Sequence, residues 1–249
     1  EFTEIMDEKK IAIVTGASRG IGRATAVELA RTGYYVVINY NSSEAAAVET
    51  LAKVQAAGSS GEIQKFDVAN AAEVKEALAK IVEKHKRIDV LVNNAGVTAD
   101  GLFMLMGEEE WHGVINTILH GFYNVTKPVL REMVRKKHGA IVSVSSISAM
   151  IPNRGQANYA AAKAGINAAS RSLAKEVARF GIRVNVVAPG PIGTDMLSSM
   201  PMDENMIKSV IPMARVGNPE EVARVIRFLC SDDASYITGQ VIAVNGGMF

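Results

Sequence analysis

A tyrosine and a lysine four residues apart are the side chains of this sequence best suited to moving a proton. Tyr159 and Lys163 lie in the segment Asn-Tyr-Ala-Ala-Ala-Lys, whose alanine-rich composition predicts a helix with both side chains on one face. A phenol has a pKa of about 10 and is idle at neutral pH. An ammonium group ~4 Å away favours the phenolate by roughly 4 kcal/mol at an effective dielectric of ~20. We therefore expect Lys163 to lower the pKa of Tyr159.

A serine at the end of a predicted strand could complete this pair. Ser146 precedes Tyr159 by 13 residues. A tyrosine of this kind exchanges a proton with an alcohol or carbonyl oxygen while a hydride moves at carbon, and a hydroxyl aimed at that oxygen stabilises its developing charge. Tyr-x-x-x-Lys pairs are common on helix surfaces, so the catalytic set Ser146, Tyr159 and Lys163 depends on the elements around it.

A glycine-rich turn near the amino end supplies that context. The segment Thr15-Gly-Ala-Ser-Arg-Gly-Ile-Gly22 follows a buried strand and opens a helix. Missing side chains let the backbone approach a pyrophosphate, and the helix start presents free N–H groups to its charge. A tight turn chosen only for packing is the alternative. The residues of this turn expected to bind a dinucleotide are Gly16, Ser18, Arg19, Gly20, Ile21 and Gly22.

The end of the second predicted strand indicates which dinucleotide is preferred. A carboxylate there would bind a ribose 2′-hydroxyl and repel a 2′-phosphate. The segment Asn39-Tyr-Asn-Ser-Ser43 contains no acid before Glu44, and Arg19 lies in the glycine turn. This pattern favours NADP(H) over NAD(H) and places Asn39 at the cofactor, although Arg19 could instead be an ordinary surface residue.

Strand-like and helix-like patterns alternate along the whole chain. Strands are expected at 11–14, 35–39, 62–66, 90–92, 140–144, 183–187 and 241–244. Helices are expected at 20–31, 43–57, 71–85, 108–137, 158–180 and 220–230. This alternation predicts an α/β fold, a Rossmann-like doubly wound parallel sheet of about seven strands with helices on both faces. Because no linker separates two halves, residues 1–249 are expected to form one domain, with residues 1–8 a disordered tail or partly a cloning remnant.

Composition excludes several other classes of protein. Hydrophobic residues make up 48% of the 249 residues, which rules out intrinsic disorder. A net charge of +1 argues against a nucleic-acid coat. The single cysteine, Cys230, and four histidines without ligand-like spacing argue against disulfides and against a metal site. No run of 18 apolar residues and no signal sequence is visible, so we expect a cytoplasmic protein that does not bind membranes.

Two stretches could contact a substrate. The irregular segment 189–219 holds five of the eleven methionines, Met196, Met200, Met202, Met206 and Met213; such flexible side chains suit a lid over an apolar acyl chain, or gap-filling in an oligomer contact. The basic run Arg131, Arg135, Lys136 and Lys137 could dock an acidic carrier protein or the phosphate of its pantetheine arm, or be a solvated helix end.

Taken together, these motifs resemble the short-chain dehydrogenase/reductase family over nearly the whole chain. The matching motifs are the glycine turn, Asn93-Asn-Ala-Gly96, Ser146, Tyr159 with Lys163, and Pro189-Gly190. Within the family, Gly155–Gly165, Ile182–Gly190 and Asn245–Met248 are most similar to β-ketoacyl-acyl carrier protein reductases, also called 3-oxoacyl-ACP reductases. The resemblance implies NADPH-dependent reduction of a carrier-bound 3-oxoacyl thioester in fatty-acid or polyketide-like biosynthesis, usually by a homotetramer.

The resemblance also implies further cofactor contacts. Asp67 and Val68 would lie at the adenine, Asn93, Ala95 and Gly96 along the ribose side, and Pro189, Gly190, Ile192 and Thr194 towards the nicotinamide. Alternatives within the family are an alcohol dehydrogenase acting on free sugars, steroids or small ketones, and an enoyl reductase, which is disfavoured because those enzymes typically have a wider Tyr-to-Lys spacing.

One position departs from the family. By spacing, Ile118 stands where the family has a fourth catalytic residue, an Asn that helps to hold a water linking the lysine to solvent. On an α-helix Asn116 and His120 lie about 200° away from position 118 and cannot replace it. The resemblance leaves three interpretations: a relay through the backbone and other waters, a slowed enzyme that needs a partner subunit in a hetero-oligomer, or a weakly active chain.

Overall fold

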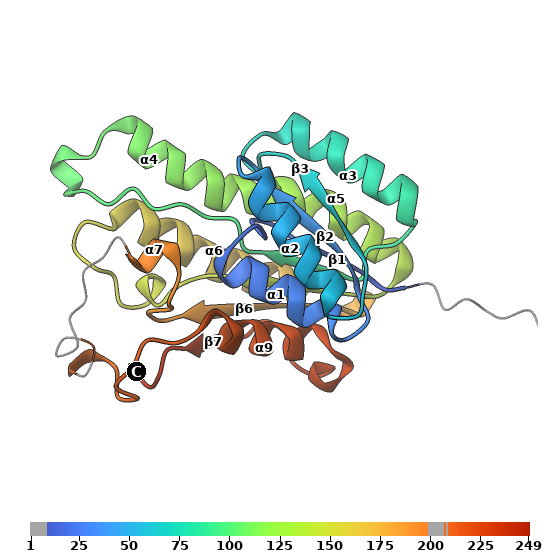
Figure 1. The fold of residues 1–249 in the computed structure, drawn as a ribbon. Coiled ribbons are helices and arrows are strands. Elements are labelled where there is room, and N and C mark those ends of the chain that lie inside the picture. Colours follow the sequence, from blue (N-terminus) through green and yellow to red (C-terminus); the bar gives the residue numbers. More distant parts are fainter. Residues whose placement is uncertain (1–8, 199–206, 208) are drawn as a thin grey trace, which may run out of the picture.

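The computed structural model describes residues 9–198, 207 and 209–249. The expectations for residues 1–8 and for Met200, Met202 and Met206 therefore lie outside the described residues. Seven parallel strands form one sheet in the order β3-β2-β1-β4-β5-β6-β7 (Figure 1). The strands are β1 (Ile11–Val14), β2 (Tyr35–Tyr40), β3 (Gly61–Lys65), β4 (Val90–Asn93), β5 (Gly139–Val144), β6 (Ile182–Pro189) and β7 (Val241–Val244). The predicted parallel sheet is confirmed, and the expected strand at 62–66 begins one residue earlier.

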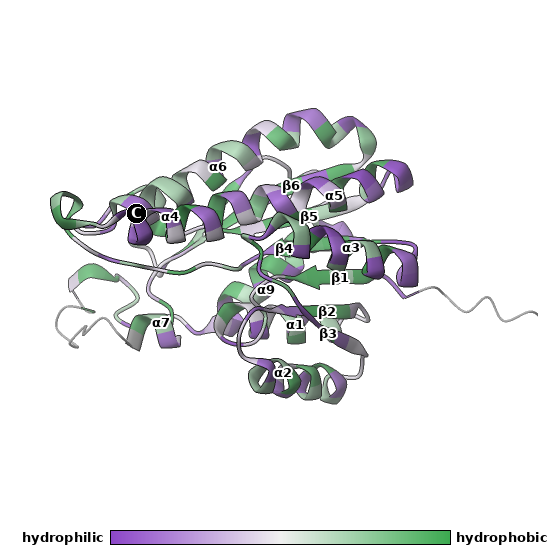
Figure 2. Cartoon of the chain, turned by 90° about the horizontal axis from the view of Figure 1, so that it is seen from above, coloured by the Kyte–Doolittle hydropathy of each residue, from purple (hydrophilic) through white to green (hydrophobic). Residues whose placement is uncertain are grey.

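Helices cover both faces of this sheet. They are α1 (Gly20–Ala30), α2 (Glu44–Ala56), α3 (Ala71–His85), α4 (Glu108–Ile115), α5 (Gly121–Lys136), α6 (Ala157–Val177), α7 (Asp195–Ser198) and α9 (Pro219–Cys230). Figure 2 shows α1, α2 and α9 on one side of the strands and α3, α5 and α6 on the other. In β1, Ala12 and Val14 pack towards the first group, whereas Ile11 and Ile13 pack towards the second. The uninterrupted apolar strands are thus explained by burial on both faces.

The strand order places a crevice between β1 and β4. β1 pairs with β2 on one side and with β4 on the other. The chain leaves β1 for α1 on one face and leaves β4 for α4 and α5 towards the opposite face (Figure 1). Loops that diverge at such a switch point open a ligand site at the carboxyl ends of the strands.

Two regions differ from the sequence expectation. The expected helix 108–137 is interrupted by a π-helical turn, Asn116–His120, between α4 and α5; one extra residue is thus accommodated in a single turn. The expected irregular segment 189–219 begins inside β6, contains α7, and is closed by a parallel bridge between Ile192 and Gly217. Among the described residues, no helix is long and apolar enough to cross a membrane.

Candidate active site

The glycines after β1 are required by close packing against the loop after β4. Gly16 has a φ of +60°, and a Cβ on it would lie 2.9 Å from the Cα of Ala95. A Cβ on Gly22 would lie 2.3 Å from the carbonyl oxygen of Gly16 and 2.5 Å from Nδ2 of Asn94. A Cβ on Gly20 (φ +55°) would lie 3.3 Å from the Thr194 side chain. At this position the positive φ is what favours glycine at the start of α1.

Side-chain hydrogen bonds fix this turn from two neighbouring strands. The Thr15 hydroxyl accepts hydrogen bonds from the backbone N–H groups of Asn94 (3.0 Å) and Ala95 (3.1 Å). Nδ2 of Asn94 donates to the carbonyl oxygens of Thr15 and Gly16. Asn39 is buried; its Oδ1 accepts from the N–H of Gly16 and its Nδ2 donates to Phe66. The side chain of Asn39 therefore positions the turn, and its contact with the cofactor stays a prediction.

The two arginines of the turn differ in function. Arg23 donates to the carbonyl oxygen of Ser18 at 2.7 Å and forms an ion pair with Glu49, so it holds the turn closed. The Arg19 guanidinium is exposed and lies 3.3 Å from the Asp195 carboxylate on α7. Such an exposed pair is weak, which leaves the Arg19 guanidinium able to exchange partners.

The start of α1 has the properties of a phosphate site. No side chain caps this helix, and its N-cap residue is Arg19 in an extended conformation. The first N–H groups of a helix have no intrahelical partner, and they point towards an anion placed at the helix start. An uncapped helix after a glycine turn with two arginines, and no acid at the end of β2 before Glu44, fits a dinucleotide that carries an extra 2′-phosphate.

The other expected cofactor residues line the same edge of the sheet. Val68 is buried beside Gly121, and Asn124 holds the Val68 carbonyl oxygen at 3.0 Å. The carboxylate of Asp67 accepts a hydrogen bond from the N–H of Ala69. The amide of Asn93 donates to the Thr126 hydroxyl at 2.9 Å. These residues thus form one wall, directly after β3 and at the end of β4.

The last strands supply the opposite wall. Pro189 ends β6, and Gly190 approaches Asn245 so closely that a Cβ would lie 2.9 Å from its Cα. Ile192 is buried, and the Thr194 side chain lies near Gly20. The residues after β6 are thereby held beside the start of α1.

The three expected catalytic residues come together where β5 ends and α6 begins. Ser146 follows β5, and its hydroxyl accepts a hydrogen bond from the N–H of Ser148 at 3.1 Å. Tyr159 and Lys163 are both buried on α6, with the Lys163 Nζ 5.6 Å from the centre of the Tyr159 ring. Nζ of Lys163 donates to the Val144 carbonyl oxygen at 2.7 Å.

Burial dominates the ionisation of this pair and corrects the sequence expectation. Burial raises the pKa of Tyr159, a hydrogen bond from Ser146 lowers it, and the charge of Asp100 raises it further. Burial also lowers the pKa of Lys163 to about 8. The expected lowering of the Tyr159 pKa by Lys163 is therefore wrong for the protein alone: desolvation acts on both groups, and the lysine points at a backbone carbonyl.

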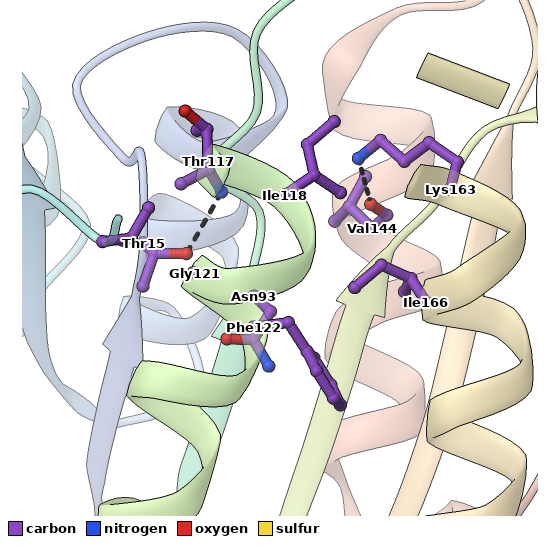
Figure 3. A pocket seen from close by; sticks show the side chains of 11 residues that line it. Thr15, Asn93, Thr117, Ile118, Gly121, Phe122, Val144, Lys163 and Ile166 are labelled. Carbon is purple, nitrogen blue, oxygen red and sulfur yellow. Dashed lines mark hydrogen bonds between the residues drawn. The ribbon is translucent and has the colours of Figure 1, made fainter. Parts of the chain in front are cut away.

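Ile118 closes the inner side of the lysine. It is buried in a cluster with Val114, Tyr159, Ala162 and Ile166, and it faces the Lys163 amino group from the neighbouring helical segment (Figure 3). The pocket between them has about 10 Å³ of space for a water-sized sphere, the lower limit for one water molecule. Gly96 also approaches the lysine, since a Cβ on it would lie 3.5 Å from Lys163 Nζ and 3.7 Å from the Ile118 side chain.

Several supporting residues were not among the site residues expected from the sequence. Asn158 is fully buried and donates to the carbonyl oxygens of Ala99 and Glu110, which ties α6 to α4. Gln156 and Asp100 are joined by a hydrogen bond of 2.8 Å. The available signal in the sequence is their position: Gln156 and Asn158 lie at the start of the segment that holds Tyr159, and Asp100 follows Asn93-Asn-Ala-Gly96.

The two expected substrate contacts are placed differently. The basic run lies at the far end of α5, which starts beside Val68 and ends before β5 begins; Arg135 pairs there with Glu132. All four basic residues are exposed there, and docking of a carrier protein on this helix end stays a prediction. Met196 and Met213, the described methionines of the 189–219 segment, are 41% and 64% exposed. Among the described residues, no cluster of three metal-ligating side chains occurs.

Comparisons with known proteins found reductases that are similar over nearly the whole chain. A family model described as enoyl-(acyl carrier protein) reductase matches residues 16–249. The 3-oxoacyl-[acyl-carrier-protein] reductase of Synechocystis is 48% identical over 240 residues, covering 96% of either chain. The 3-oxoacyl-[acyl-carrier-protein] reductases FabG of Staphylococcus aureus and Thermotoga maritima are each 45% identical, over 98% and 97% of this chain and 100% and 98% of their own.

Proposed function

Because the chain belongs to the short-chain dehydrogenase/reductase family, we propose that it reduces 3-oxoacyl thioesters carried on an acyl carrier protein, with NADP(H) as its cofactor. The product is the 3-hydroxyacyl thioester, in fatty-acid or polyketide-like biosynthesis. The observation that carries the proposal is the convergence of Ser146, Tyr159 and Lys163 beside a glycine turn with an uncapped helix start. The names of the relatives support the thioester substrate.

The chain's own residues would hold the substrate and deliver a proton. Bound NADPH supplies the hydride that adds to the carbonyl carbon. The Ser146 hydroxyl would donate a hydrogen bond to the carbonyl oxygen, and the Tyr159 hydroxyl would give its proton to that oxygen as the negative charge develops. Because burial raises the pKa of Tyr159, the phenol holds its proton at neutral pH, as a donor must. Lys163, whose amino group is held by the Val144 carbonyl oxygen, would then return a proton to Tyr159.

The cofactor assignments extend the expectations from the sequence. We propose that the N–H groups of Gly20 and Ile21 hold the pyrophosphate and that Arg19 leaves Asp195 to pair with the 2′-phosphate. Ser18, Gly16 and Gly22 shape this turn. Asp67 and Val68 would flank the adenine. The remaining proposed contacts are Asn93, Ala95 and Gly96 on one wall and Pro189, Gly190, Ile192 and Thr194 on the other.

The proposal also covers the oligomeric state of the protein and its location in the cell. Phe103, Met104 and Leu105 are 70%, 90% and 75% exposed, and such an apolar patch is typical of an interaction surface. We propose a cytoplasmic homotetramer of single-domain subunits, in which segment 189–219 covers the substrate. Ile118 supports a second candidate, an impaired subunit that works with an active partner. Sedimentation of the purified chain, alone and after co-expression with a reductase subunit that has Asn at the position of Ile118, distinguishes the two: a homotetramer forms without the second subunit, whereas an impaired subunit forms a mixed oligomer with it.

A substrate panel tests the proposal. NADPH and NADH oxidation are followed with acetoacetyl thioesters, free and carrier-bound, with free ketones, and with an enoyl thioester. We expect turnover of the 3-oxo thioesters with a preference for NADPH. Tyr159→Phe should lower kcat by about 10²- to 10⁴-fold, whereas Tyr123→Phe, an exposed tyrosine four residues before Lys127 on α5, should not. An unchanged rate in Tyr159→Phe, or turnover of the enoyl thioester alone, would refute it.

A further inference from the structure

A buried amide that catalysis does not use lies at the start of α6. The Gln156 side chain is 5% exposed, and three polar side chains from separate segments surround it. Its Nε2 donates to Oδ2 of Asp100 at 2.8 Å. Its Oε1 accepts from the Ser148 hydroxyl at 3.1 Å and from Nδ2 of Asn153 at 3.4 Å. The amide therefore joins the loop after β4, the 3-10 turn Ile147–Ala149 and the start of α6.

The carboxylate at one end of this network fixes the direction of every bond in it. An ionised carboxylate can only accept hydrogen bonds, so the nitrogen of the Gln156 amide must face Asp100. The amide oxygen then faces Ser148, and the Ser148 hydroxyl must donate its proton to it. A neutral amide at position 100 would leave both orientations of Gln156 open.

The other end of the network reaches the groups that move the proton. The Ser148 N–H donates to the Ser146 hydroxyl oxygen at 3.1 Å, and Ser146 lies near enough to Tyr159 to lower the pKa of its phenol. The Gln156 carbonyl oxygen accepts from the N–H of Ala160 at 2.8 Å, in the first turn of the helix that carries Tyr159. The backbone adds a further tie, since Gly101 N–H donates to the Gly155 carbonyl oxygen at 2.9 Å.

We infer that Asp100 and Gln156 are positioning residues for the reduction, which orient the Ser146 hydroxyl and hold the loop after β4 against the start of α6. This inference rests on the proposed function, because it assigns the pair a role through Ser146 and Tyr159. Gln156 is the buried connection and Asp100 is the charge that gives the network its polarity.

The charge of Asp100 has a second effect on the same site. It raises the pKa of Tyr159 in addition to burial. In the part of the chain that the structure describes, the ionisable groups facing the phenol are Asp100 and Lys163; the side chains that pack there from α4, the π-helical turn and the turn after β5 are the uncharged Val114, Ile118 and Ser146. Removal of the Asp100 charge should therefore let the phenol lose its proton at lower pH.

Exchange of the two side-chain chemistries tests the pair. Asp100→Asn should lower kcat by about tenfold, the size expected when a charged hydrogen bond is lost, and should move the alkaline limb of the kcat–pH profile to lower pH. The KM for NADPH should not change. Gln156→Glu places two carboxyl groups within hydrogen-bond distance, so its kcat should be lowest above pH 7 and should recover towards pH 5.5, where the two can share a proton.

The double variant Asp100→Asn/Gln156→Glu restores one amide and one carboxylate and should recover most of the loss of Gln156→Glu. The control is Asp233→Asn, an exposed change on the turn Asp232–Ala234, which should behave as wild type. Thermal melting confirms that each variant is folded. Single variants with wild-type kcat and pH profile, or a double variant no better than Gln156→Glu, would overturn the inference. Loss of turnover in the wild-type chain itself would refute the proposed function instead.

Discussion

Replacement of Lys163 by methionine should make the protein inactive and, at neutral pH, more stable. The Lys163 side chain is 4% exposed, and burial lowers its pKa from 10.5 to about 8. The folded protein therefore disfavours the protonated form that the lysine has in the unfolded chain at pH 7. Methionine has a similar length and carries no charge, so it removes this cost while still filling the space.

The two pKa values set the size of the effect. At about 1.4 kcal/mol for each pH unit, protonated Lys163 costs the folded state roughly 3 kcal/mol at pH 7. Loss of the bond to the Val144 carbonyl oxygen offsets about 1 kcal/mol, which leaves a net gain of about 2 kcal/mol for Lys163→Met. Because the folded chain has the lower pKa, the unfolded chain binds more protons between pH 8 and pH 10.5. The stability of wild type consequently rises with pH through this window.

Urea unfolding of both proteins without nucleotide, at pH 7, 8.5 and 10, measures this difference. At pH 10 the cost of protonated Lys163 falls to about 1 kcal/mol, so the advantage of Lys163→Met should vanish there. Lys175→Met, on the exposed face of the same helix, is the matched control and should stay within about 0.5 kcal/mol of wild type. A variant no more stable than wild type at pH 7, or equally favoured at pH 10, would refute the reasoning.

Three further substitutions probe packing, two in the site and one on α4. Gly22→Ala places a Cβ 2.3 Å from the Gly16 carbonyl oxygen, so it should abolish NADPH binding and lower the melting temperature. Gly113→Ala, with open space around it on α4, should instead stabilise the protein by about 0.5–1 kcal/mol. Calorimetry and nucleotide titration check both variants, and normal NADPH affinity in Gly22→Ala would contradict the prediction. Ile118→Asn inserts an amide into the buried cluster around Tyr159 and should lower the free energy of unfolding in urea by about 2–3 kcal/mol. Its kcat should stay within about threefold of wild type if the wild-type chain already relays protons to Lys163 along the backbone at Val144 and through waters. A tenfold gain in kcat would instead identify the wild-type chain as an impaired subunit.

Patterns of local origin were the ones that the sequence could predict. Apolar runs such as Ile11–Val14 located the buried strands, and the spacing of Tyr159 and Lys163 placed both on one helix. The turn at Asn116–His120 was not predictable, because an α-helix and a helix with one π-helical turn share the same apolar periodicity over so few residues.

The features that could not be predicted concern interactions between distant segments. Asn39 has the residue type and position of a cofactor contact, and pairing of β2 with β3 gives its side chain a further role, because it brings the Phe66 carbonyl oxygen within hydrogen-bond distance. The pKa of Tyr159 could not be predicted from its spacing to Lys163, since the depth of burial of both groups and the charge of Asp100 arise from the tertiary fold. The role of Gln156 is likewise invisible until three loops are brought together.

The bridge between Ile192 and Gly217 joins the two ends of the chain that runs between these residues. Gly193 and Gly217 each donate a backbone hydrogen bond across it, at 2.9 and 3.0 Å, to Gly217 and Pro191. The two ends of the intervening stretch are thereby held at a constant separation, whatever its composition. Since the entropy of closing a loop changes slowly with its length, a segment of another length between Gly193 and Gly217 should cost little in closure entropy, and under the proposed function such exchanges would test whether this segment sets the acyl-chain preference.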